Sequence, residues 1–102
     1  MYGPEPPGHW TKTLGTPRNF QMLEAGRRYR VIKNFRDYDG DEHPIGEMWT
    51  YLGYSFAPHD DGVSIFVAIR SDEWHIRLQW RKEEQADIID ALASYLSLVK
   101  AG

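Results

Sequence analysis

Hydrophobic and polar residues alternate along three stretches of the chain, at 29–35, 47–56 and 73–80, and residues 63–69 form a near-continuous apolar run. A period of two, with many β-branched and aromatic residues, is typical of strands. The links between residues 47–56, 63–69 and 73–80 are short, which favours antiparallel neighbours. The pattern therefore predicts an antiparallel meander of four or five strands within residues 27–80.

After residue 82 the spacing of the apolar residues changes to three and four. Such spacing places them on one face of a helix, and Glu83 and Glu84 suit the first helical turn. We therefore expect one C-terminal helix over 83–99 that packs on an open face of the sheet. The predicted fold class is α+β. The predicted core contains Tyr29, Val31, Leu52, Ile65, Val67, Ile69, Ile76, Leu78, Ile89, Leu92 and Leu96.

Residues 1–19 contain four of the six prolines and three glycines, without apolar periodicity. Such a composition predicts a flexible arm, in which Trp10 is a candidate point of attachment to the rest of the chain. Residues 20–102 are expected to form a single globular domain, since 102 residues suit one domain.

Composition narrows the function classes. The net charge of −3 disfavours nucleic acid as a partner, and the absence of cysteine excludes disulfides and thiolate metal sites. No apolar run reaches the roughly 18 residues of a membrane span, and residues 1–15 lack the apolar segment of a secretory signal. We expect a cytoplasmic protein with no membrane partner.

The stretch "DYDGDEHPIGE" at 37–47 raises the question of a calcium loop. An EF-hand loop needs glycine at its sixth position and glutamate at its twelfth. Counted from Asp37, these positions hold Glu42 and Met48. The Asp-Gly pair instead predicts a tight acidic turn, in which aspartate side chains accept hydrogen bonds from nearby backbone amides.

Other chemistry is sparse in the sequence. A zinc site would need His43 and His59 to converge with Asp60 or Asp61, and spacing does not supply that convergence. There is no nucleophile elbow and no phosphate-binding glycine loop, so no cofactor and no metal is expected. The acidic residues of the 37–43 and 59–61 loops leave a hydrolase-type enzyme or a metal-binding protein as the alternative. The basic stretch "RRYRVIKNFR" at 27–36 leaves a nucleic-acid-binding module as a second alternative.

Trp49 and Tyr51 share one face of the second predicted strand, opposite a face that includes Met48, Leu52 and Phe56. If the latter face packs inward, an aromatic pair is exposed beside the acidic loop, where it would suit protein recognition. The other interpretation is that both faces of the sheet are covered.

The chain contains the distinctive motifs "DYDGDEHPIGE", "LGYSF" and "HDDG". Through these motifs it resembles a family of bacterial domains of about 80 residues, known as a domain of unknown function, over residues 26–95. The resemblance implies no activity, cofactor or catalytic residue. A looser similarity links the layout to SH3-like barrels, which implies a partial barrel. The paired tryptophans of peptide-binding SH3 domains are missing, and a helix is expected where their last short strand would be.

In an SH3-like layout, the loops after the first and second strands flank one groove. The sequence therefore favours a non-enzymatic protein-binding module, regulatory or inhibitory, with an acidic, aromatic-lined rim for a partner with a basic surface. The predicted binding residues are Asp37, Tyr38, Asp39, Asp41, Glu42, Trp49, Asp60 and Asp61.

Overall fold

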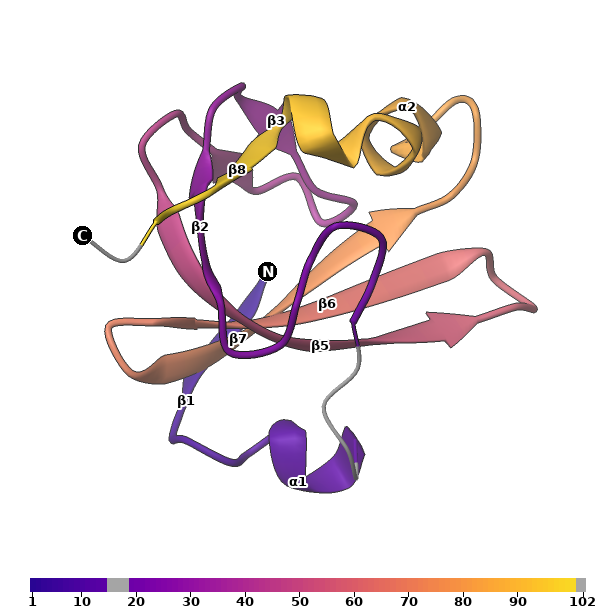
Figure 1. Cartoon of the computed structure of the whole chain (residues 1–102). Coiled ribbons are helices and arrows are strands. Elements are labelled where there is room, and N and C mark those ends of the chain that lie inside the picture. Colours follow the sequence, from indigo (N-terminus) through magenta and orange to yellow (C-terminus); the bar gives the residue numbers. More distant parts are fainter. Residues whose placement is uncertain (15–18, 101–102) are drawn as a thin grey trace.

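The computed structural model describes residues 1–14 and 19–100 (Figure 1). Its main feature is a six-stranded antiparallel sheet with the strand order β1-β7-β6-β5-β2-β8. A two-stranded sheet of β3 and β4 stands beside it. The elements in chain order are β1 (Tyr2–Glu5), α1 (Thr11–Leu14), β2 (Arg28–Val31), β3 (Phe35–Arg36), β4 (Glu42–His43), β5 (Met48–Ala57), β6 (Gly62–Ile69), β7 (Asp72–Gln79), α2 (Ala86–Asp90), the 3-10 turn η1 (Leu92–Ser94) and β8 (Leu96–Leu98).

The predicted meander of antiparallel strands is present as β2, β5, β6 and β7. The strands curl around one core, with β2 and β8 crossing over the β5–β7 layer and α2 above one end (Figure 1). Of the eleven predicted core residues, Leu52 and Ile69 are only half-buried, and the other nine are buried. Alternation, the apolar run at 63–69 and the spacing of three and four after residue 82 together identified most of the core.

The predicted inward face of β5 is wrong. Trp49 and Tyr51 are buried, whereas Phe56 is 44% exposed. Gly53 is buried as well, so the odd-numbered residues Trp49, Tyr51 and Gly53 face the core. The register with β6 shifts between Tyr51 and Gly53, which indicates a β-bulge in this strand pair.

The predicted 83–99 helix is also wrong. The segment divides into α2, η1 and β8, and β8 pairs with β2 through Arg30 and Ser97. The spacing of three and four still holds locally, since Ile89, Leu92 and Leu96 are all buried. Pairing with β2 outweighs helix propensity at the C-terminal end, because it satisfies the backbone groups along an otherwise open strand edge.

Residues 1–14, which belong to the stretch expected to be a flexible arm with Trp10 as a candidate point of attachment, pack against the sheet. β1 pairs with β7, and Trp10 packs on Phe66 and His75. The buried Glu73 side chain of β7 accepts hydrogen bonds from the segment that leads into α1. Residues 15–18 of the predicted arm and 101–102 of the predicted domain lie outside the described residues.

Candidate functional site

The acidic stretch forms a tight turn, braced by the side chain of Asp37. One oxygen of this carboxylate accepts hydrogen bonds from the backbone N–H groups of Asp39 and Asp41, each at 3.0 Å. Gly40 has a φ of 88°, a conformation that glycine adopts without strain. Asp37 is 1% exposed, so this predicted binding residue is a structural brace of the loop.

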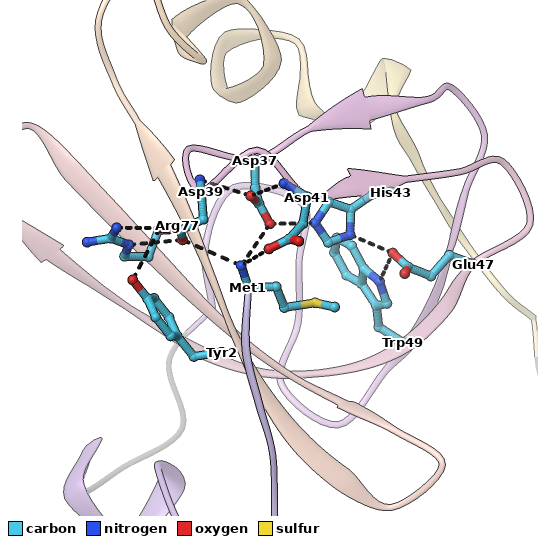
Figure 2. Close-up of polar contacts among 9 residues, drawn as sticks. All are labelled: Met1, Tyr2, Asp37, Asp39, Asp41, His43, Glu47, Trp49 and Arg77. Carbon is cyan, nitrogen blue, oxygen red and sulfur yellow. Dashed lines mark hydrogen bonds and ion pairs between the residues drawn. The ribbon is translucent and has the colours of Figure 1, made fainter.

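Behind the turn, His43 lies between two carboxylates (Figure 2). Its Nε2 is 2.8 Å from Asp37, and its Nδ1 is 2.7 Å from Glu47. The Trp49 indole N–H donates to the same Glu47 carboxylate at 2.9 Å, and the Phe35 ring stacks on the imidazole. The loop is thereby fastened to β5 by a buried network whose polar groups are all paired.

Burial alone would lower the pKa of His43, but the hydrogen bonds to Glu47 and Asp37 outweigh burial and raise the pKa above its ordinary 6.5. An imidazolium between two carboxylates is therefore favoured. The His43 side chain is 0% exposed, so no substrate can contact it. A histidine flanked by acids resembles a catalytic relay, yet this one is buried and holds the loop in place.

In front of the turn, Asp39 holds the Arg77 guanidinium through two hydrogen bonds, of which the Nε bond is 3.1 Å (Figure 2). The rings of Tyr2 and Tyr38 lie 5.2 and 5.4 Å from this guanidinium. The backbone N–H of Tyr38 also donates to the carbonyl of Arg77. These contacts fix the tip of the acidic loop against the edge of β7.

The other predicted acids are mostly paired with cations as well. Asp41 binds the α-amino group of Met1, Glu42 binds Arg36, and Asp61 binds Arg81. Asp60 is exposed and has no ion pair within the part of the chain that the structure describes. The predicted rim is therefore largely neutralised, by Arg36 of the 27–36 basic stretch and otherwise by cations outside that stretch.

A groove runs along β6 and β7 between the two loops that the sequence singled out. Its volume is about 520 Å³. Tyr38 and Asp60 both line it, while Arg77 and Arg81 supply positive charge. We call it the loop groove, lined by Tyr38, Ala57, Asp60, Gly62, Val63, Ser64, His75, Arg77, Leu78, Gln79 and Arg81.

Among the predicted binding residues, Tyr38 and Asp60 line the loop groove, and Asp39 and Asp61 contact its arginines. Trp49 lies elsewhere, buried beside His43, so its predicted role as an exposed anchor is wrong. Arg77 and Arg81 were missed by the sequence analysis.

Asp39 is unsuited to be the proton donor of the hydrolase alternative. The hydrogen bonds from Arg77 outweigh burial and lower the pKa of Asp39 from 3.8 to about 2. A carboxylate with so low a pKa carries no proton to give at neutral pH. Over residues 1–14 and 19–100, no three His, Asp or Glu side chains are arranged to hold a metal ion, and no helix is long and apolar enough to cross a membrane.

The comparisons with known proteins identify the family. The family model described as "Domain of unknown function (DUF3601)" matches residues 14–101. The chain belongs to this family. The resemblance to a domain of unknown function that the sequence motifs indicated is therefore confirmed, and membership of this family assigns no activity.

A solved structure is similar to this DUF3601 domain. It is the integron cassette protein VCH_CASS4 from the mobile metagenome of Vibrio cholerae, with 33% sequence identity and a TM-score of 0.78. The similarity covers 79% of this chain and 90% of that chain. No curated protein matches the chain.

The Asp39–Arg77 pair can be tested by titration. Replacing Arg77 by leucine should raise the pKa of Asp39 from about 2 toward its ordinary 3.8, because the dominant hydrogen bond is lost. Carboxyl carbon shifts followed by NMR against pH measure this value. The matched variant Arg81→Leu, which removes the partner of Asp61, should leave the pKa of Asp39 unchanged. A wild-type Asp39 that titrates at 3.8 would contradict the pairing.

Proposed function

We propose that the chain is a non-enzymatic protein-binding module, which takes an extended segment of a partner protein in the loop groove. The observation that carries the proposal is that Tyr38 and Asp60, 22 residues apart in sequence, line one groove. A cavity between loops held on a rigid sheet is a typical location for recognition. His43 and Arg77 hold the 37–42 loop in place, so little conformational entropy is lost on binding.

The strand order supports an SH3-like layout for this module. β2 is followed by the long 32–47 connection, then by β5, β6 and β7, and η1 leads into β8, which returns to β2. A short last strand beside the first is the feature that the sequence analysis found missing. In such a layout the loop groove lies between the loop after the first strand and the loop after the second.

The chemistry of the groove favours a partner segment with a basic residue beside an apolar one. Tyr38 is 43% exposed and offers an aromatic surface, and the Asp60 carboxylate has no ion-pair partner among the described residues. A lysine or arginine of the partner would pair with Asp60 while its apolar neighbour packs on Tyr38. Because Asp39 and Asp61 are already paired, charge contributes less to this affinity than the sequence predicted.

Selection from a random linear peptide library on the immobilised chain tests the proposal. We expect enriched peptides that combine lysine or arginine with a large apolar residue, and weaker binding as salt increases. Tyr38→Ala should lower the affinity for the enriched peptides by about tenfold or more, as truncation of an aromatic anchor does. Asp60→Asn should weaken only the peptides that carry the basic residue.

The matched control is Ile45→Ala, which truncates a 64% exposed side chain outside the loop groove and should leave binding unchanged. If no peptide is enriched, or if the enriched peptides bind the Tyr38 and Asp60 variants as well as the wild type, the proposal is wrong.

A further inference from the structure

The N-terminal segment, residues 2–11, lies outside the part of the chain that the family model matches, which begins at residue 14. It nevertheless adds a strand to the family domain. β1 pairs with β7 through Tyr2 with His75 and Glu5 with Glu73, and runs along that strand (Figure 1). The part of β7 that β1 covers would otherwise be a sheet edge, with backbone groups ready to pair with another segment.

A carboxylate on β7 accepts hydrogen bonds from the N-terminal segment. Glu73 is 4% exposed and accepts hydrogen bonds from the backbone N–H groups of Gly8 at 2.6 Å and Trp10 at 2.9 Å. It also accepts from the N–H and the hydroxyl of Thr11, at 3.3 and 3.0 Å. All four donors come from this segment. Glu73 itself lies within residues 14–101, which the family model matches, whereas its described hydrogen-bond partners precede residue 14.

Aromatic side chains complete the contact. The Trp10 ring packs on Phe66 of β6 and His75 of β7, with ring centroids 6.0 and 5.8 Å apart. The Tyr2 ring lies 5.6 Å from the same His75 ring. The surface thus combines a strand edge, an acceptor for backbone N–H groups and a patch for aromatic side chains, which are the parts of a site for strand addition.

The N-terminal segment is peripheral to the core. The buried core cluster begins at Leu23, and Tyr2 is 46% exposed. Leaving the surface would remove the contacts of Met1 with the core cluster and with the acidic loop, and would unpair β7 and Glu73. This surface of β6 and β7 binds an extended segment, and every copy of the chain carries the sequence of that segment.

We propose that the β7 edge, with Glu73, Phe66 and His75, is a peptide-acceptor site that takes the N-terminal segment of a second copy of this chain. In dilute solution the chain's own segment occupies the site, because its effective concentration there is on the order of millimolar. At high concentration, or when the intramolecular contact is weakened, the identical segment of another copy replaces it and makes a strand-exchanged dimer. His75 lines both sites, but the loop groove proposal depends on Tyr38 and Asp60, which the acceptor site does not include.

A labelled peptide tests the acceptor site. The probe is a fluorescent synthetic peptide of residues 2–14, acetylated at its N-terminus, titrated with the full chain and followed by fluorescence anisotropy. The variant Trp10→Ala weakens the chain's own segment and leaves the acceptor intact, so it should bind the probe about tenfold or more tightly than the wild type does. Adding Glu73→Ala to this variant should abolish binding, and Lys12→Ala, which truncates an exposed side chain, should behave as the wild type.

Hydrogen exchange of residues 2–5 reports whether the segment has been released, and Tyr2→Ala is added to Trp10→Ala where those amides remain protected. A folded variant with a released segment that fails to bind the probe overturns the proposal. Probe binding that survives the loss of Glu73 overturns it as well. Tyr38→Ala and Asp60→Asn test the loop groove separately, so one proposal can fail while the other holds.

Discussion

Replacing His43 by leucine is expected to lower the free energy of unfolding by about 3–5 kcal/mol at neutral pH, the usual cost of removing one partner from a buried ion pair. The leucine would leave the buried carboxylate of Asp37 and the partly buried one of Glu47 facing an apolar side chain. Urea denaturation followed by tryptophan fluorescence measures this loss. The matched control is His59→Leu, the same substitution at an exposed position, with an expected change within about 0.5 kcal/mol.

The cost of losing His43 should depend on pH. Because the folded-state pKa of His43 is raised above 6.5, its protonation contributes stability that is fully present below about pH 6.5 and is lost as pH rises through the folded-state pKa. The groups that face the imidazole are Asp37 and Glu47, with the Met1 amino group and Asp41 next to Asp37.

The difference in unfolding free energy between wild type and His43→Leu should therefore become smaller as pH rises above the folded-state pKa of His43. Taking this difference cancels the titration of shared groups that do not contact His43. A difference that stays constant over the whole pH range, or a loss near zero at neutral pH, would show that the network does not hold the loop.

The sequence predicted those parts of the fold whose pattern is local. Alternation located β7, and a short apolar run located β6, nearly to their ends. Alternation alone could not decide which face of β5 packs inward, because both faces carry large apolar side chains. Helical spacing failed at Leu96–Leu98, which pair with residues of β2 that lie 65 to 69 positions earlier in the chain.

The candidate site shows the same division between local and distant contacts. The turn around Asp37 followed from its Asp-Gly pair, and Tyr38 and Asp60 were placed on one groove by analogy of loop order. The cations that neutralise the acids could not be assigned, because Arg77 lies 38 residues from Asp39. A weak signal existed for Arg77, which alternates with buried residues on β7 and so had to lie on the outer face of the sheet.

Truncating Leu92 to alanine is expected to cost about 2–5 kcal/mol of unfolding free energy, as for other buried leucines. Leu92 is 1% exposed in η1, and it belongs to the same core cluster as Ile89 and Leu96. The cavity would loosen the turn that directs β8 onto β2, so the cost includes more than the lost contact area. Chemical denaturation of the purified variants measures the effect.

Leu98→Ala is the matched control for this prediction. It makes the same substitution on β8, six residues along the chain, but Leu98 is 40% exposed, so we expect a loss of about 1 kcal/mol or less. Equal losses at the two positions would mean that the C-terminal segment docks as a whole rather than through Leu92. A loss near zero at Leu92 would mean that α2 and η1 do not pack on the sheet, and that the core closes without them.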